Sequence, residues 1–450
     1  MESIHIYHTN DIHSHLERWP RIHDFLLERK KMHQKKGEDV FLFDIGDFID
    51  RWHPFSEGTK GLGNIDLLNE CGFSAVTIGN NEGINLSFED LNQLYDNAQF
   101  DVLVANLYQK GKIHPLWLKP FEIYRTGSGT RMAVIGLTAP FSHLYELLGW
   151  QLTDPFLELK EWINLLKENT DIIILLSHLG IKEDERIAEE FPEIDVILGG
   201  HTHHVLQEGK LVNNTILCAA GNYGNYVGHV TLQVDQHKKL ESKKAILYDV
   251  NKLPVTKDEQ ERTEAFILNG KKRLTQKVIS LREPLVSDPL KETKLAVLLC
   301  KALREWCKAD CALINAGLLL GPLTGDVTAY DLLSICPHPI NPCKIKLTGQ
   351  ELKDILLISK NVEWPNRQIK GLGFRGTVMG IMIYDQIIFK DDLILVNGSE
   401  LDLERNYTLA LPDMFTFGFF FPDLLQSQHK EYFLPEFLRD ILKWKLQKQF

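Results

Sequence analysis

The chain has 450 residues, of which 44% are hydrophobic and 25% are charged, and its formal net charge is −11. This composition is typical of a globular protein with a large core, and the length predicts two domains. The acidic balance, without a long basic run, argues against nucleic acid as a partner, because binding to polyphosphate needs a lysine- or arginine-rich surface. A small anionic substrate remains compatible with this charge if metal ions supply positive charge locally.

The cysteines and the N-terminus bear on the compartment. The seven cysteines form no Cys-x-x-Cys pair and most lie in apolar runs, so we expect buried free thiols in a reducing compartment. The chain begins directly in the strand-like segment Ile4-His5-Ile6-Tyr7, and no uninterrupted apolar stretch has membrane length. These features predict a cytoplasmic protein without a membrane partner.

Up to about Val234, short apolar runs alternate with helical periods. Strands are predicted at Ile4–His8, Val40–Asp44, Ala75–Ile78, Val102–Ala105, Met132–Leu137, Ile172–Ser177, Val196–Leu198 and Ile216–Ala219. Helices are predicted at Trp19–Lys36, Asn64–Glu70, Phe88–Asn97, Pro155–Glu168 and Glu183–Phe191. Such alternation predicts α/β layering, in which ligands gather at the carboxyl ends of the strands.

A second unit follows the charged, helix-prone segment Lys252–Arg282, which Pro254 and Gly270 interrupt. Its predicted elements are a helix at Lys294–Lys308, a strand at Cys311–Asn315, a helix at Ala329–Ile335, a strand at Lys344–Leu347 and a helix at Thr348–Ser359. Thr348 and Glu351 form a predicted capping box, and the tail from Phe374 is β-like. We therefore assign residues 1–250 to the first domain, 251–284 to a connector and 285–450 to the second domain.

Five predicted strands are followed by side chains that bind metals. These side chains are Asp11 and His13, then Asp47, Asn80, His178, and finally His201 and His203. Alone, an aspartate after a strand usually caps a turn and a histidine is usually structural. Their recurrence at successive strand ends favours a dinuclear site at one sheet edge. Asp, Asn and His without cysteine favour manganese, zinc, iron or magnesium over a structural Cys-type zinc site. We expect Gly199 and Gly200 to turn the backbone sharply, so that both following imidazoles point to one place.

Taken in order, Asp-x-His, Gly-Asp, Gly-Asn-Asn-Glu, Ser-His-Leu-Gly and Gly-Gly-His-Thr-His resemble the motifs of the calcineurin-like metallophosphoesterases. Asn315-Ala316-Gly317, the segment 325–332 and the segment 346–353 resemble the second domain of 5′-nucleotidases. The resemblance covers almost the whole chain and points to a two-domain, intracellular bacterial type. It implies an α/β/β/α sandwich, followed by a smaller α+β domain that binds substrate.

The resemblance also implies a ligand set and a reaction. One divalent ion would be held by Asp11, His13, Asp47 and His203, and a second by Asp47, Asn80, His178 and His201. The ions could be Mn, Zn, Fe, Co or Mg. They would activate a hydroxide for in-line attack on phosphorus, without a covalent enzyme intermediate. The absence of a P-loop or nucleophile-elbow signature fits this reaction.

The sequence departs from the family at the catalytic histidine. The family places a histidine after the ligand asparagine and an aspartate a few residues later to orient it. Here Asn81 stands at the histidine position and Ile84 at the aspartate position. Asparagine donates a hydrogen bond but carries no proton, and general-acid help is worth about 10²–10⁴-fold. The chemistry is therefore slower or served by another group, and His53 and His204 are the nearest alternatives.

The second domain departs as well, because leucines follow Gly317 where the family has a phosphate-binding arginine. The residues that we expect to bind substrate are Asn315, Phe374, Arg375, Phe417 and Phe420. Arg375 is the candidate replacement for the missing arginine. Phe374 and one of Phe415, Phe417, Phe419 or Phe420 would stack on a base, at about 1–3 kcal/mol per base. The alternative is that the phenylalanines of the apolar run 417–421 belong to the core.

The leading hypothesis is a metal-dependent hydrolase of nucleotides in nucleotide catabolism, 5′-nucleotidase-like, whose substrates extend to cyclic phosphodiesters or nucleotide-sugar pyrophosphates. One alternative is a phosphoesterase for a non-nucleotide substrate. Another is a nucleotide-binding protein with little turnover, because Asn81 replaces the family's histidine. The partner is a small phosphoester in each case, and the sequence leaves the oligomeric state open.

Overall fold

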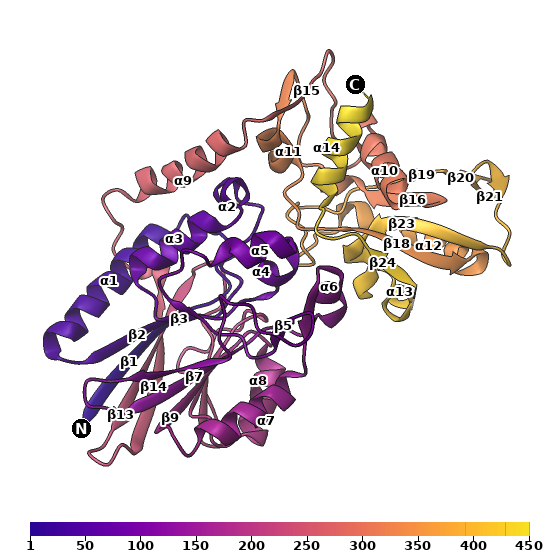
Figure 1. Ribbon diagram of the computed structural model, residues 1–450. Helices are drawn as coiled ribbons and strands as arrows, with labels where there is room; N and C mark the ends of the chain where they lie inside the picture. The colour runs from indigo at the N-terminus through magenta and orange to yellow at the C-terminus, as the bar shows by residue number, and fades with distance from the viewer. Residues whose placement is uncertain (392, 428, 450) are drawn as a thin grey trace. The chain divides into compact units, whose positions relative to one another are not determined.

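The structure is a computed structural model that describes residues 1–391, 393–427 and 429–449. The chain forms two units, Met1–Gly270 and Lys271–Phe450 (Figure 1). The division between them lies inside the segment 251–284, which the sequence assigns to a connector.

The first unit contains two six-stranded sheets. The first sheet consists, in spatial order, of β14 (Leu240–Asp249), β13 (Tyr226–Val234), β1 (Glu2–Thr9), β2 (Asp39–Asp44), β3 (Ala75–Val76) and β4 (Asp101–Val102). The second consists of β11 (Lys210–Val212), β12 (Thr215–Cys218), β10 (Val196–Gly199), β9 (Ile172–Ser177), β7 (Arg131–Leu137) and β6 (Phe121–Arg125). A separate pair joins β5 (Leu107–Gln109) and β8 (Trp150–Leu152). The helices are α1 (Trp19–Lys36), α2 (Pro54–Thr59), α3 (Leu62–Cys71), α4 (Asn80–Asn85), α5 (Phe88–Leu94), α6 (Ser142–Leu147), α7 (Pro155–Leu166), α8 (Ile181–Glu190) and α9 (Glu259–Arg273).

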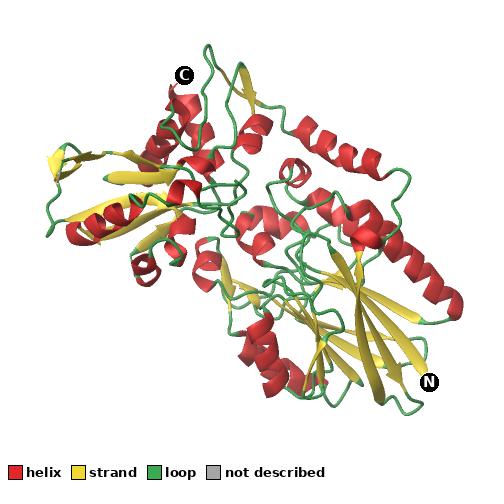
Figure 2. Cartoon of the chain, turned by 180° about the vertical axis from the view of Figure 1, so that it is seen from behind, coloured by secondary structure: helices red, strands yellow, loops and turns green. Residues whose placement is uncertain are grey.

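The two sheets pack face to face because their strands are apolar on both sides. In β9, Ile174 and its neighbours at even positions join the core between the sheets, whereas Ile173 and Leu175 join the core under α7 and α8. Helices α1 and α3 lie outside the first sheet, and α7 and α8 lie outside the second (Figure 2). The predicted α/β/β/α sandwich is thereby confirmed.

Each predicted strand of the first unit overlaps an observed strand, and α1 has the predicted bounds. β3 ends two residues earlier than predicted, at Val76, because the chain leaves the sheet toward Gly79 and the loop beyond it. The antiparallel strand β14 was not predicted. Only Ala245 of this strand is buried and many of its residues are polar, so its apolar pattern is weak.

The second unit is built on a five-stranded sheet, β19 (Met382–Asp385), β16 (Cys311–Asn315), β23 (Asn406–Pro412), β18 (Pro342–Thr348) and β24 (Lys430–Tyr432). Two small sheets join β15 (Lys277–Ser280) to β17 (Asp326–Thr328), and β20 (Ile387–Lys390), β21 (Leu393–Val396) and β22 (Ser399–Glu400) to one another. Its helices are α10 (Lys294–Cys307), α11 (Ala329–Ile335), α12 (Gly349–Ser359), α13 (Pro422–Gln426) and α14 (Leu438–Gln449). This unit is α+β, as the sequence predicts.

The predicted capping box at the start of α12 is present. Thr348 Oγ1 accepts from the Glu351 backbone N–H, and the Glu351 carboxylate accepts from the Thr348 N–H at 2.7 Å. The tail, which we predicted to be β-like, instead ends in the helix α14. Its buried residues Leu438, Ile441, Leu442 and Leu446 repeat at helical spacing, so the signal was in the sequence.

All seven cysteines are free and buried, as predicted. Across residues 1–391, 393–427 and 429–449, no helix combines the length and the apolar character that a membrane crossing requires.

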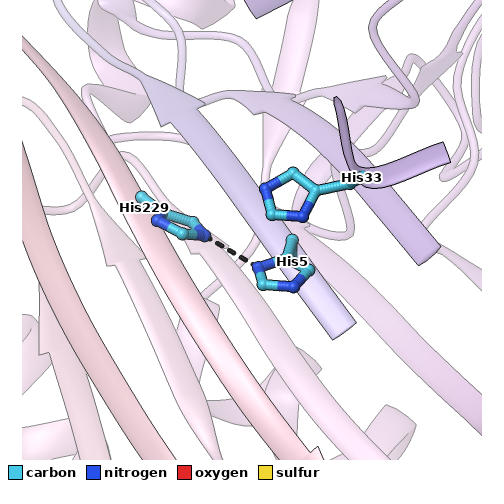
Figure 3. Close-up of side chains that lie close together, drawn as sticks. All are labelled: His5, His33 and His229. Carbon is cyan, nitrogen blue, oxygen red and sulfur yellow. Dashed lines mark hydrogen bonds between the residues drawn. The ribbon is translucent and has the colours of Figure 1, made fainter. Parts of the chain in front are cut away.

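Three buried histidines, His5, His33 and His229, gather between α1 and the outer face of the first sheet (Figure 3). His5 of β1 and His229 of β13 approach to 3.0 Å between Nδ1 and Nε2. Glu38 Oε2 lies 2.7 Å from His33 Nδ1 and 3.4 Å from His5 Nε2, and the Tyr7 hydroxyl lies 3.0 Å from His33 Nε2. The contacts tie the end of α1 to two strands.

This histidine cluster predicts a loss of stability in acid. Burial, followed by the charge of neighbouring histidines, lowers the pKa of His5 to about 4 and that of His229 to about 3, from 6.5. The unfolded chain therefore takes up these protons first. The contribution of these two histidines to the free energy of unfolding is complete above pH 6.5. It is lost as the pH falls from 6.5 toward 4, by up to about 1.4 kcal/mol per pH unit for each group. Unfolding midpoints measured from pH 7.5 to 4.5 should show this slope.

His229→Phe, whose ring can still stack on Tyr7, should reduce the pH slope because it removes one of the two groups. The matched control is His237→Phe, at an exposed histidine in the turn after β13, which should leave the slope unchanged. Equal slopes for the wild type and His229→Phe would contradict this interpretation of the cluster.

Candidate metal centre

Six of the seven side chains predicted to bind metals come together at the carboxyl ends of β1, β2, β9 and β10, and the seventh, Asn80, begins α4 after β3. One group consists of Asp11, His13 and His203, and a second of Asp11, Asp47 and His178. Within the first group, His203 Nε2 lies 3.3 Å from both Asp11 Oδ1 and His13 Nε2. Each group offers three nitrogen or oxygen atoms at the mutual distances that ligands of one metal ion require.

Asp11 belongs to both groups, and Asp47 also lies close to a histidine of each. Asp47 Oδ2 lies 3.6 Å from His13 Nε2 and 3.4 Å from His178 Nε2. His201 belongs to the same corner, because its backbone N–H donates to the Asp11 carboxylate and its ring centroid lies 5.3 Å from that of His178. This position of Asp47 fits a carboxylate shared by two ions.

The chemistry of these donors fits divalent cations. Among the described residues, the buried His178 Nε2 and Asn80 Oδ1 have no hydrogen-bond partner. Two buried carboxylates, Asp11 and Asp47, concentrate negative charge beside them. Burial opposes the charged form of His178, but Asp47 and Asp11 outweigh burial and raise its pKa to about 10. Positive charge is thus favoured at this point. A bound cation would supply it and would also give His178 Nε2 and Asn80 Oδ1 a partner.

Another group of histidines, His5, His33 and His229, is also close enough to hold an ion. The rings of His5 and His33 are stacked at 3.7 Å with their planes 26° apart, so their in-plane lone pairs run nearly parallel. By contrast, the His13 and His203 rings are 5.3 Å apart at 78°, which lets their nitrogens converge. The residues at the carboxyl ends of the strands of the two large sheets therefore form the better metal centre.

The backbone at the centre is unusual. Five of the predicted ligands have left-handed φ, namely Asp11 (52°), His13 (49°), Asp47 (52°), His201 (69°) and His203 (57°). Non-glycine residues rarely adopt this conformation, and it gathers at functional sites where the surrounding structure holds it in place. The left-handed conformation allows side chains two positions apart, such as Asp11 and His13, to point to the same place.

The expected role of Gly199 and Gly200 was wrong, because neither has left-handed φ and the histidines themselves make the turn. Glycine is required there for space. A Cβ on Gly200 would lie 3.0 Å from His178 Nδ1 and 3.2 Å from Asp11 Oδ2, and a Cβ on Gly199 would lie 2.5 Å from Asp184 Oδ2. The close approach of the β10 loop to two ligands depends on these missing side chains.

The ring nitrogens turned away from the centre are held in place. His178 Nδ1 donates to the Ile45 carbonyl at 2.6 Å, which leaves Nε2 as the ligand atom. His203 Nδ1 lies 3.0 Å from Asn222 Nδ2. Such partners fix the tautomer and the orientation of a metal-binding imidazole. Sequence reasoning missed Asn222, since it lies on a loop that carries no ligand.

Glu82 supports the loops from behind, a role that the sequence did not reveal. Its carboxylate accepts hydrogen bonds from the backbone N–H groups of Asp47, Ile49 and Gly79, at 2.9, 2.8 and 2.9 Å. The available signal was its position three residues after Gly79, which forms a capping box at the start of α4. Glu82 thereby joins the loop of Asp47 to that of Asn80.

At the position of the family's catalytic histidine, the Asn81 amide nitrogen lies 3.0 Å from Asp47 Oδ2 and 2.8 Å from His13 Nδ1. Asn81 Oδ1 accepts from Asn85 Nδ2 at 2.5 Å. The partner that orients residue 81 is therefore Asn85. His53 is used as the N-cap of α2, where it accepts from the Phe55 N–H, and the exposed His204 contacts Thr202.

The predicted substrate-binding residues lie in the second unit. Phe374 is buried and stacks on His338, with 5.1 Å between ring centroids and 4° between planes. The Arg375 backbone N–H donates to the same imidazole at 2.9 Å. Asn315 is buried and donates to the Met379 carbonyl at 2.8 Å. These three residues belong to one packed region, and one ring face of Phe374 is already covered.

The second aromatic position divides into core and surface residues. Phe420 is buried against Trp364 and Phe415, which agrees with the core alternative. Phe417 and Phe419 are 42% and 56% exposed. Phe417 therefore keeps a face available for a ligand, whereas Phe420 does so only if its neighbours move.

Residues 4–205 match the family described as calcineurin-like phosphoesterase, and residues 275–419 match the 5′-nucleotidase C-terminal domain. The chain is 43% identical over 461 residues to "Uncharacterized metallophosphoesterase YunD" of Bacillus subtilis (strain 168), covering 99% of each chain. It is 26% identical over 423 residues to a 5′-nucleotidase of Vibrio parahaemolyticus, covering 78% of this chain and 74% of the relative.

Solved structures share the fold. A putative 5′-nucleotidase of Staphylococcus aureus superposes with a TM-score of 0.71 at 18% identity, covering 100% of this chain and 97% of the other. The NAD nucleotidase of Haemophilus influenzae superposes with a TM-score of 0.66 at 17% identity, covering 99% and 96%. Both similarities extend over the two units of the chain.

Proposed function

We propose that this chain, which belongs to the calcineurin-like metallophosphoesterases, hydrolyses phosphoesters of nucleotides at a centre of two divalent metal ions. The observation that carries the proposal is the gathering of Asp11, His13, Asp47, His178 and His203 from four loops, with the buried His178 Nε2 and Asn80 Oδ1 unpaired among the described residues. The family consists of phosphoester hydrolases. The 5′-nucleotidase type of the second domain supports a nucleotide as substrate.

Each protein group has a role in this reaction. Asp11, His13, Asp47 and His203 hold one ion, and Asp47, Asn80, His178 and His201 hold the other. When bound, two divalent ions supply a hydroxide at neutral pH and neutralise charge on the reacting phosphoryl group. The Ile45 carbonyl and Asn222 keep two of the imidazoles oriented. Mn, Zn, Fe, Co and Mg all suit this donor set.

In the second unit we assign substrate contacts to Asn315, Phe374, Arg375, Phe417 and Phe420. The exposed ring of Phe417 supports stacking on a base, and the half-buried Arg375 supports binding of phosphate. We also assign the protein to the reducing cytoplasm, which the seven buried free thiols support.

A non-nucleotide phosphoester is the second candidate substrate. The burial of Phe374 and Phe420 favours it, because a base needs two open ring faces to be sandwiched. A nucleotide-binding protein with little turnover is a third candidate, favoured by the amide of Asn81.

The test is release of phosphate from matched nucleoside monophosphates, cyclic nucleotides, nucleotide sugars and sugar phosphates, with manganese or cobalt added. We expect turnover of nucleotides above the level of a His201→Ala control. Faster turnover of sugar phosphates would favour the second candidate, and tight nucleotide binding without turnover would favour the third. The proposal fails if no phosphoester is hydrolysed above the control.

A further inference from the structure

We propose that Asn85 is a positioning residue that holds the Asn81 amide as a fixed hydrogen-bond donor, and that the centre is specific for phosphorus–oxygen bonds, phosphoanhydrides above all, whose leaving oxygen departs without a proton. Nucleotide pyrophosphates contain such bonds, whereas nucleoside monophosphates do not. This inference rests on the proposed hydrolase function and names the substrate class of the same site.

The geometry of the two amides fixes their direction. Asn81 and Asn85 are buried and lie four positions apart, so they are neighbours on one face of α4. Asn85 Nδ2 lies 2.5 Å from Asn81 Oδ1, and Asn81 Nδ2 lies 3.0 Å from Asp47 Oδ2. If the Asn81 amide rotated by half a turn, its oxygen would face the Asp47 carboxylate and its NH₂ would face that of Asn85. The contact with the Asp47 carboxylate would be repulsive, so the orientation in which Asn81 donates to Asp47 is the stable one.

The helix that carries both residues is itself held firmly. Arg51 Nη1 donates to the Asn85 carbonyl at 2.8 Å, and Glu82 anchors the first turn through three backbone N–H groups. Gly83 packs so closely on Tyr145 that a Cβ there would lie 1.8 Å from the hydroxyl oxygen. The Asn81 amide is thus pre-positioned.

The chemical consequence follows from what an amide cannot do. In hydrolysis, the hydroxide oxygen forms a new bond to phosphorus while the bond from phosphorus to the leaving oxygen breaks, and that electron pair stays on the leaving oxygen. A nucleoside 5′-alkoxide is strongly basic and needs a proton as it departs. A phosphate leaving group is weakly basic and departs as an anion, so its departure needs no proton donor in place of the family's histidine.

Three nearby groups that could donate a proton have other contacts. His53 caps α2, and His204 contacts Thr202 on the surface. Asp50 lies 3.5 Å from His13 Nδ1 on the side away from the other ligands. The amide pair therefore stands in place of a histidine and a carboxylate without their proton-transfer ability.

The experiment measures kcat/KM for a series of aryl and alkyl phosphates with leaving groups of rising pKa, together with a nucleotide-sugar pyrophosphate and the matching nucleoside monophosphate. For the wild type, we expect kcat/KM to fall steeply as the leaving-group pKa rises, and to be higher for the pyrophosphate than for the monophosphate. The double variant Asn81→His with Asn85→Asp supplies an imidazole and a carboxylate. It should make kcat/KM depend less on the leaving-group pKa and raise kcat/KM for alkyl phosphates by about 10²–10⁴-fold.

Single substitutions test the positioning role. Asn85→Ala should lower kcat by about 10–100-fold, as is usual for a residue that orients a group at a metal centre. Asn85→Asp, although closer in shape, should be slower than Asn85→Ala, because a carboxylate repels Asn81 Oδ1. Asn69→Ala removes a half-buried amide that caps a loop away from the centre, and should match the wild type. Metal content should stay unchanged in all of these variants.

A shallow slope for the wild type, faster turnover of the monophosphate, or wild-type rates for Asn85→Asp would overturn this inference while leaving the hydrolase function standing. If the metal-loaded wild type hydrolyses no member of the series, the hydrolase function is wrong and this inference fails with it.

Discussion

Replacing Asp47 with asparagine should lower kcat by about 10³-fold or more and remove at least one of two bound metal ions. Asp47 Oδ2 lies 3.6 Å from His13 Nε2 and 3.4 Å from His178 Nε2, so the same oxygen lies beside one histidine of each group of ligands. Metal ions contribute several kcal/mol to stabilising the transition state, and each 1.4 kcal/mol or so is a factor of ten in rate. An amide has the shape of the carboxylate without its charge.

The measurement combines kcat with the metal content of the dialysed protein. The matched control is Asp184→Asn in α8, a buried aspartate of the same unit that contacts the Ser177 hydroxyl. Burial raises the pKa of Asp184 to about 8, so its carboxyl is already neutral at pH 7 and the amide should change little. Two bound ions and wild-type turnover in Asp47→Asn would show that this residue does not bridge the ions.

The sequence predicted the layered fold and the position of Asp11, His13, Asp47, His178 and His203 at strand ends, because both depend on local signals. Apolar runs mark buried strands, and polar residues directly after them must lie at one sheet edge when the strands are parallel. Asp47 and His178 are far apart in the chain, yet each follows such a run, and β2 and β9 place them 3.4 Å apart. Because β2 and β9 belong to different sheets, the meeting of these two residues also depends on the face-to-face packing of the sheets, which local signals do not predict.

Features that depend on packing between distant segments were not predictable. The need for Gly200 arises from the side chains of His178 and Asp11, and the pairing of Asn81 with Asn85 instead of residue 84 depends on how α4 is oriented. Likewise, an apolar run such as 417–421 does not reveal which ring faces inward. The structure buries Phe420 and exposes Phe417, because Trp364 comes from elsewhere in the chain to cover the former.

Replacing Glu82 with alanine should destabilise the first unit by several kcal/mol, because three buried backbone N–H groups lose their acceptor at once. A buried donor left without a partner costs about 1–3 kcal/mol, and the total is then comparable to the whole stability of a domain. The loops of Asp47 and Asn80 would also separate, so metal content should fall together with the denaturation midpoint. Glu82→Gln retains one acceptor oxygen and should lie between the alanine variant and the wild type, which keeps the test informative if Glu82→Ala does not fold.

A second buried glutamate provides the control for this prediction. Glu158 of α7 accepts from the side chains of Tyr108, Thr153 and Trp162, at 2.9, 2.7 and 3.3 Å. Side-chain donors can rotate toward water or another acceptor, whereas backbone N–H groups fixed in a loop cannot, so Glu158→Ala should cost less stability and leave the metal content unchanged. If the two alanine variants unfold at the same denaturant concentration and bind the same amount of metal, Glu82 does not hold the ligand loops together. The centre would then be shaped by the ligands themselves and by the close approach of Gly79 and Gly200.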